Sequence, residues 1–225
     1  MLSQVIADVF TPANIQYLII GLIITLGIAV CTVLLSVLIG SVLAICRNYE
    51  KIILGKIAGV YIEIFRNTPL LLWILVCVFT IRGGNPLLRG SLALVLYTSS
   101  VIAEIVRGGL NAIPKGQFEA ANSQGFRFHQ TIFYIVLPQC FHKIVPSLMS
   151  QIVTTIKDTS FLSQFAIMEF FYRSRIIMSS LSQSVTVTSL HVFVIFLFVA
   201  LVYFVINFTL SSFVHGMQKK ALTSY

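Results

Sequence analysis

Ionisable side chains inside apolar segments are the first candidates for chemistry in this chain. Asp158 follows Lys157 and precedes Thr159 and Ser160, in a segment that is otherwise largely apolar. A carboxylate beside two hydroxyl groups can bind an ammonium group, and Glu169 in the same segment is a second acidic candidate. We therefore treat Asp158, Thr159, Ser160 and Glu169 as candidate ligand-binding residues. The alternative is that Asp158 is neutralised by Lys157 or by a neighbouring helix.

Two further acidic residues are each followed by an arginine three positions later, as Glu63 with Arg66 and Glu104 with Arg107. Residues at positions i and i+3 lie on one face of a helix, so each pair can neutralise itself. Charges near the end of an apolar helix can also reach the membrane interface through long side chains. We expect these two pairs to have a structural or gating role rather than to contact a ligand.

Signs of catalysis or of a metal site are missing from the sequence. No nucleophile stands with a base, so an enzyme is not expected. Gly55-Lys56 lacks the preceding glycine of a phosphate-binding loop, so the chain should not hydrolyse ATP itself and needs no cofactor of its own. The four histidines do not recur at metal-ligand spacing, and no metal site is predicted. The four cysteines contain no CxxC pair and are predicted to be packing residues.

The composition identifies the surroundings in which these residues act. The 225 residues are 57% hydrophobic and only 10% charged, whereas a soluble domain carries roughly 25% charged residues to solvate its surface. Soluble folding is therefore excluded, and the lipid bilayer is the expected solvent. The net charge of +8 is expected from basic cytoplasmic loops and not from nucleic-acid binding.

Hydropathy predicts an all-α polytopic bundle of about five transmembrane helices, formed by residues 1–225 as a single domain. Between Asp8 and Arg47 there is no charged residue, a gap of about 38 positions where a span needs ~20. Pro69 is expected to kink the second helix. The predicted spans are Gln16 to Cys46, Ile57 to Ile81, Gly90 to Ala112, Ile144 to about Phe171, and Leu190 to Val214.

The distribution of basic residues predicts the orientation. With the N-terminus outside and the C-terminus inside, inner segments outnumber outer ones in Lys and Arg by roughly two to one, as the positive-inside rule requires. The inner residues are then Arg47, Lys51, Lys56, Lys115, Arg127, Lys143, Lys219 and Lys220. The outer residues are Arg82, Arg89, Arg173 and Arg175.

The polar stretch from Pro114 to Lys143 is predicted to be a compact helix–turn–helix and not a floppy linker. A short helix is expected from Gln117 to Gln124, because Pro114 precedes it and Gly125 can adopt the left-handed conformation that ends a helix. Pro138 should interrupt the second helical piece. The alternative is an amphipathic hairpin that lies at the membrane interface without a partner.

The spacing within this stretch resembles the EAA loop in the membrane subunits of bacterial ABC importers. The matching residues are Glu119, Ala120, Ala121, Gly125, Ile135, Leu137 and Pro138. Segments 63–71, 103–109, 113–117 and 157–160 are similar to the polar amino-acid permeases, one branch of that family. The resemblance extends from roughly Tyr17 to the last span, and it implies a bundle like that of type I ABC importers.

This resemblance implies the partners and the mechanism. Glu119, Ala120, Ala121 and Gly125, with Leu137 and Pro138, would couple to a dimer of ATPase subunits that carries ATP and Mg²⁺. A second membrane subunit, identical or different, would complete the path for an amino acid. From its charge and its place in an apolar segment, Asp158 is our leading candidate residue for that path. An extracytoplasmic binding protein would deliver the amino acid to a bacterial inner membrane. The alternatives are an ion- or proton-coupled secondary transporter and a membrane scaffold.

Overall fold

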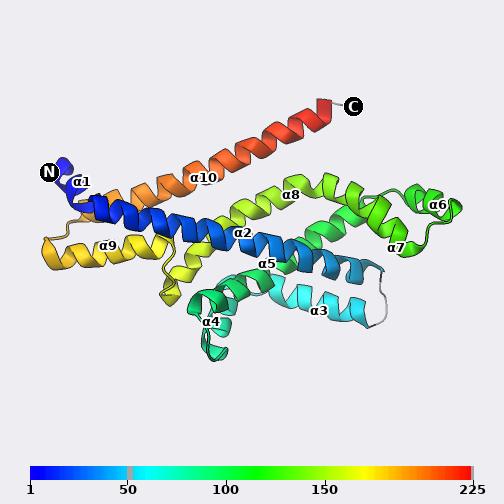
Figure 1. The fold of residues 1–225 in the computed structure, drawn as a ribbon, viewed down its shortest axis with the longest axis horizontal. Helices are drawn as coiled ribbons and strands as arrows, with labels where there is room; N and C mark the ends of the chain where they lie inside the picture. The colour runs from blue at the N-terminus through cyan, green and yellow to red at the C-terminus, as the bar shows by residue number, and fades with distance from the viewer. Residues whose placement is uncertain (50–52, 224–225) are drawn as a thin grey trace.

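The protein is an elongated bundle of helices in the computed structural model shown in Figure 1. The structure describes residues 1–49 and 53–223, and it describes their side chains except those of residues 184 and 214–223. Glu50 and Lys51 therefore lie outside the described residues. The described part holds helices and no strand, which confirms the all-α prediction. The helical segments are α1 (Leu2–Val9), α2 (Pro12–Tyr49), α3 (Leu54–Arg66), α4 (Leu70–Thr80), α5 (Pro86–Asn111), α6 (Lys115–Ser123), α7 (Phe128–Gln130), η1 (Thr131–Val136), α8 (Leu137–Asp158), η2 (Thr159–Phe165), α9 (Phe170–Ser184) and α10 (Ser189–Thr223).

The number of membrane spans agrees with the prediction. Four helical runs in the described residues are long and apolar enough to cross a bilayer, and the bent pair α3 and α4 makes a fifth. The N-terminus lies at one end of the bundle and α6 at the other, and α10 runs toward the end where α6 lies (Figure 1). The four continuous runs are Pro12–Tyr49, Pro86–Asn111, Phe128–Phe165 and Ser189–Phe213.

The fourth span begins earlier than hydropathy alone predicted. The helical run starts at Phe128 and ends at Phe165, whereas the sequence favoured a span from Ile144 to about Phe171. The loop between the third and fourth spans is correspondingly shorter than the expected stretch that ended at Lys143. Pro138 does not interrupt this run, because the backbone widens into a π-helical turn, η1, immediately before it. Such a turn accommodates a proline ring that would clash in a regular helix.

The second span is broken where Pro69 was expected to kink it. Helices α3 and α4 meet at an angle of 103° across a short break. Pro69 caps α4 in an extended conformation, with φ −64° and ψ 135°. The Thr68 hydroxyl accepts a hydrogen bond from Trp73 Nε1 at 2.6 Å and donates one to the Ile64 carbonyl at 2.6 Å. The break is therefore fixed on both sides by one side chain.

A segment that the sequence assigned to a loop forms a further helix, α9, which lies beside α2 at the N-terminal end of the bundle (Figure 1). Arg173, expected in an outer loop, is only 8% exposed on this helix. Its guanidinium donates to the Met168 and Tyr17 carbonyls at 3.0 and 3.3 Å. It also lies over the Tyr17 ring, 4.2 Å from the centroid. The charge of Arg173, which was predicted to lie in a water-exposed loop, is thus surrounded by backbone carbonyls and an aromatic face.

The buried face of helix α2 consists mainly of small residues, whereas many residues on its exposed face are large and apolar. Close packing of this kind drives helix association in lipid, where the hydrophobic effect between helices is absent. Gly40 marks the tightest approach, because a β-carbon there would lie 2.8 Å from the Ser99 carbonyl oxygen and 3.0 Å from the Ala103 nitrogen. Nearby, the Ser36 hydroxyl donates to the Val95 carbonyl at 3.2 Å. The buried face of α2 consists of Leu18, Gly21, Thr25, Ile28, Ala29, Thr32, Ser36, Gly40 and Ala44.

Gly40→Ala should lower the free energy of unfolding in detergent by about 1–3 kcal/mol, because the obstructing atoms belong to the α5 backbone and cannot rotate away. Gly27→Ala, on the same helix, is the matched control, since a β-carbon there meets nothing within 4 Å. Denaturation of the purified protein by sodium dodecyl sulfate, followed by circular dichroism, measures both. Equal stability of the two variants would show that α2 and α5 accommodate the added methyl group without loss of unfolding free energy.

Candidate functional site

The short helix α6 lies at one end of the molecule and carries Glu119, Ala120 and Ala121, the first three residues that resemble the EAA loop. Glu119 and Ala120 are exposed, whereas Ala121 on the adjacent face is buried. Gly125 has a φ of 81°, in the left-handed region. The Phe126 N–H donates to the Ala121 carbonyl at 3.1 Å, and the Gly125 N–H donates to Asn122 at 3.0 Å. These two bonds form a Schellman motif, so the predicted helix end at Gly125 is confirmed.

Contacts from three sides hold α6 on the bundle. Gln139 Nε2 of α8 donates to Gln117 Oε1 at 3.0 Å. The Tyr49 ring, at the end of α2, lies 6.2 Å from the Phe118 ring. Lys143 Nζ donates to the Ala112 carbonyl at 2.9 Å, in the connection between α5 and α6. Helices α2 and α8 therefore contact α6 itself, and Lys143 of α8 also binds the connection between α5 and α6.

Leu137 and Pro138 close the motif at the start of α8. Leu137 is buried and belongs to the hydrophobic cluster that also contains Ile132 and Val136, whereas Pro138 is exposed. The motif therefore divides between an exposed edge, with Glu119 and Ala120, and residues that anchor it in the core.

A cluster of five charged side chains lies where α2, α3 and α5 meet. Glu104 is its centre: Arg47 NH1 donates to Oε1 at 2.7 Å, and Arg107 NH2 donates to Oε2 at 2.8 Å. Arg66 lies 3.6 Å from the second oxygen. Arg47 also binds Glu63 at 2.7 Å. Two carboxylates thus serve three guanidinium groups, and the ion pairs join three helices.

One of the two expected pairs forms and the other does not. Glu104 and Arg107 are paired, as their spacing predicted. Among the described residues Glu63 and Arg66 share no ion pair; Glu63 binds Arg47, and Arg66 lies against Glu104. Arg47 was missed as the common partner, because it belongs to a different helix and the i, i+3 rule sees only one helix at a time. The available signal for the role of Arg47 was its position, because it is the charged residue at which a long apolar run ends.

The candidate ligand-binding residues lie around the junction of α8 and η2. Asp158 is the last residue of α8 and is half-buried, and its side chain has no hydrogen bond or ion pair among the described residues. Thr159 is fully buried, and its hydroxyl donates to the Ile156 carbonyl at 2.7 Å. Ser160 is half-buried. Of the three, Asp158 and Ser160 retain accessible side chains.

Glu169 is fully buried and caps the N-terminus of α9. Its carboxylate accepts hydrogen bonds from the backbone N–H groups of Phe171 and Tyr172 at 2.9 and 2.6 Å. The hydroxyls of Thr25 and Tyr203 donate to it at 3.3 and 3.5 Å. Glu169 therefore joins α2, α9 and α10, a role that the sequence did not indicate because both hydroxyl partners are distant in the chain.

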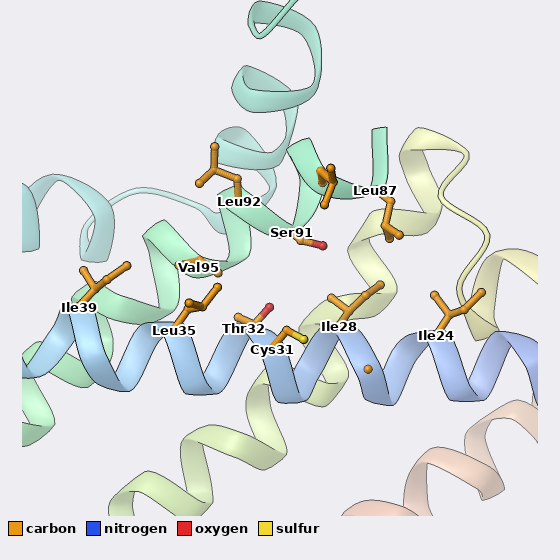
Figure 2. Close-up of a pocket in the computed structure, with 12 residues that line it drawn as sticks. Ile24, Ile28, Cys31, Thr32, Leu35, Ile39, Leu87, Ser91, Leu92 and Val95 are labelled. Atoms are coloured by element: carbon orange, nitrogen blue, oxygen red, sulfur yellow. The ribbon is translucent and has the colours of Figure 1, made fainter. Parts of the chain in front are cut away.

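A recess of about 590 Å³ lies between α2 and α5 and is almost entirely apolar (Figure 2). Thr32, Ser91 and Cys31 supply the polar atoms among its labelled side chains (Figure 2). Among the described residues that line it there is no Asp, Glu, Lys, Arg or His. Among the described residues no group of three His, Cys, Asp or Glu is placed to hold a metal ion.

Comparison with known proteins supplies an independent view of this arrangement. A family model described as "Binding-protein-dependent transport system inner membrane component" matches residues 36–222. The probable glutamine ABC transporter permease GlnP of Bacillus subtilis is 33% identical over 206 residues, covering 90% of this chain and 92% of the relative. The glutamate transport system permease GluD of Corynebacterium glutamicum is 33% identical over 230 residues, covering 97% and 81%.

Solved structures show the same architecture. A crystal structure of an amino acid ABC transporter with histidines contains a chain with a TM-score of 0.78 and 28% identity, covering 91% of this chain and 94% of that one. The methionine ABC transporter MetNI in an inward-facing conformation gives a TM-score of 0.72 at 17% identity, covering 92% and 99%, a likeness of fold alone. These matches give no support to an ion- or proton-coupled secondary transporter.

Glu104→Gln should lower the free energy of unfolding by roughly 2–4 kcal/mol, because it leaves three arginines with the single carboxylate of Glu63. Glu63→Gln is the control: its side chain is 64% exposed and binds one arginine, so its loss should cost less than about 1 kcal/mol. Unfolding in sodium dodecyl sulfate measures both variants. A Glu104 variant no less stable than the Glu63 variant would contradict the central place of Glu104.

Proposed function

This chain belongs to the family of inner membrane components of binding-protein-dependent transport systems, and we propose that it couples a partner ATPase to amino-acid uptake. It is a multi-pass inner membrane protein of that family. In the proposal, a pair of ATPase subunits binds ATP and Mg²⁺, and a second membrane subunit, identical or different, completes the path. An extracytoplasmic binding protein delivers the amino acid.

The observation that carries the coupling proposal is the exposed edge of α6. Glu119 and Ala120 project from a helix whose far end is fixed by the Schellman motif and whose body is held by α2 and α8. Alanine allows close approach of a partner surface, and a glutamate can bind a basic residue there. A surface that is small, exposed and rigidly supported is what a mechanical joint between subunits requires.

Movement of α6 would reach the spans through the charged cluster. Helix α5 ends at Asn111, and α6 begins at Lys115, so the connection between them is short. Glu104 and Arg107 stand on the last turns of α5 and bind α2 and α3 through Arg47 and Arg66. In the proposal, approach of the two ATPase subunits moves α6, and these ion pairs make the three helices move together.

The proposed path for the amino acid runs past the junction of α8 and η2. Asp158 and Ser160 have accessible side chains there, while Thr159 and Glu169 are buried and support the surrounding backbone. A carboxylate with an adjacent hydroxyl suits the ammonium group of an amino acid. The names of the relatives make glutamine and glutamate the first substrates to test.

Glu119→Lys should abolish co-purification with the ATPase subunits, because it reverses the charge on the exposed edge of α6 while touching no buried contact. Lys56→Glu is the matched control, an exposed charge reversal outside α6. Affinity purification from membranes, with ATPase subunits quantified by immunoblot, gives the result. Retained ATPase binding and uptake with Glu119→Lys would contradict the coupling proposal.

The orientation is tested separately by labelling introduced cysteines in a variant without the four native ones. In cells treated with an impermeant maleimide, Arg82→Cys should react, because residue 82 lies between the second and third spans, on the outer side in the proposal. Asn122→Cys, exposed on α6, should react only after the membrane is permeabilised. Labelling of Asn122→Cys in intact cells would place α6 where no ATPase can reach it.

A further inference from the structure

Arg66 is the surplus cation of the charged cluster between α2, α3 and α5. Three guanidinium groups share two carboxylates there, and Glu104 already accepts hydrogen bonds from Arg47 and Arg107. Arg66 reaches Glu104 only at 3.6 Å and forms no hydrogen bond among the described residues. The N–H donors of its guanidinium are therefore unused within the cluster, and one positive charge has no carboxylate of its own.

The charged cluster lies where the apolar part of the bundle ends. Arg47 is the first charged residue after the long uncharged run of α2, and it binds Glu104 in this cluster. This boundary of the spans is the cytoplasmic one in the orientation proposed above. A cation at that depth meets the layer of lipid headgroups, and the cytoplasmic leaflet carries anionic phospholipids.

Donor groups converge around one oxygen of Glu104. Arg66 and Arg107 both contact Oε2, at 3.6 and 2.8 Å, and their side chains are 44% and 35% exposed. Arg107 Nη1 has no hydrogen bond among the described residues, and neither has the side-chain amide of Asn67, which is exposed at the end of α3. Guanidinium and amide groups with unused N–H donors suit the oxygen atoms of a phosphate.

Helix α4, which follows Arg66 across the break, offers a surface for acyl chains. It turns away from α3 by 103° and contains no charged residue. Its 11 residues extend about 17 Å, close to the ~15 Å that one leaflet contributes to the hydrocarbon core. Its exposed large apolar side chains are those of Leu71, Leu72, Leu75, Val76 and Phe79.

We infer that Arg66, with Arg107 and Asn67, binds the phosphate group of an anionic phospholipid of the cytoplasmic leaflet, and that the acyl chains of this lipid lie along α4. The phosphate supplies the third negative charge of the cluster, so that three arginines face three anions. A zwitterionic lipid carries its own ammonium group beside the phosphate. The surplus positive charge therefore favours a lipid of net negative charge, such as phosphatidylglycerol.

Trp73 provides a local probe of this surface, because it is the only tryptophan of the chain and lies on the first turn of α4. Its half-buried indole binds Thr68 at the break. Lipids with brominated acyl chains quench tryptophan fluorescence on contact. In phosphatidylcholine bilayers that contain the purified full chain, brominated phosphatidylglycerol should bind about fivefold more tightly than brominated phosphatidylethanolamine, as expected for one basic residue near a membrane surface.

Arg66→Gln should remove most of this preference, because it deletes the surplus charge and leaves the hydrogen bonds from Arg47 and Arg107 to Glu104 in place. Arg66→Lys should keep most of it, since it preserves the charge. Lys56→Gln is the matched control: it removes one exposed charge near the other end of α3 and should leave the preference unchanged. Circular dichroism and unfolding in sodium dodecyl sulfate show whether each variant is folded.

The assembled complex provides a second measurement, in which partner subunits can compete for Arg66. Lipid that stays with the purified complex is extracted and quantified by mass spectrometry. The Arg66→Gln complex should retain less phosphatidylglycerol, relative to phosphatidylethanolamine, than the Lys56→Gln complex does.

The outcomes that overturn the inference are distinct from failure of the proposed function. Equal lipid preference in the wild type and Arg66→Gln, or none in the wild type, would overturn the inference alone. So would loss of the second membrane subunit from the Arg66→Gln complex with phosphatidylglycerol retained, because Arg66 would then bind a carboxylate of that subunit. Failure of the coupling proposal would instead appear in the Glu119→Lys experiment, with the lipid preference unaffected.

Discussion

A charge inside a bilayer must be neutralised by a neighbour, and the arrangement of the helices at one end of this protein follows from that constraint. Glu104 forms ion pairs with three arginines at once. Arg47 and Arg107 lie 2.7 and 2.8 Å from its carboxylate oxygens, and Arg66 lies at 3.6 Å. Because these arginines come from three different helices, their ion pairs with Glu104 also hold α2, α3 and α5 together. Helix α6 contacts this group of helices through the Tyr49 and Phe118 rings and follows α5 after a short connection.

The same constraint explains how the opposite half of the bundle is organised around buried polar groups. Glu169 is surrounded by two backbone N–H groups and two hydroxyls, and Arg173 by two carbonyls and an aromatic ring. The side chains of Glu169 and Arg173 thus have their polar partners within the protein, so neither is available to bind a solute. Lys157 and Asp158 differ, because in the described residues neither has an ion pair with another chain segment. That contrast separates charged groups with partners in other segments from charged groups without such partners in the described residues.

The sequence predicted what depends on local pattern. Long apolar runs defined the spans, and the spacing around Gly125 located the end of α6, since a left-handed residue there needs no distant partner. The sequence did not predict contacts between segments that are far apart in the chain. Thr25 and Tyr203 give no sign in the sequence that they bind Glu169, and Arg47 gives none that it takes Glu63 from Arg66. The start of the fourth span was also hidden, because polar Gln130 and Gln139 lie on its first turns and lower the local hydropathy.

The break between α3 and α4 has a consequence for biogenesis. With 11 residues, α4 extends about 17 Å at 1.5 Å per residue, well short of the ~30 Å hydrocarbon core. It cannot cross the bilayer alone, and the exposed carbonyls at its end need donors. Arg89 of α5 supplies them, binding the Val78 and Ile81 carbonyls at 2.7 and 3.0 Å. These bonds can form only after α5 has been synthesised, so the end of α4 depends on the span that follows it in the chain.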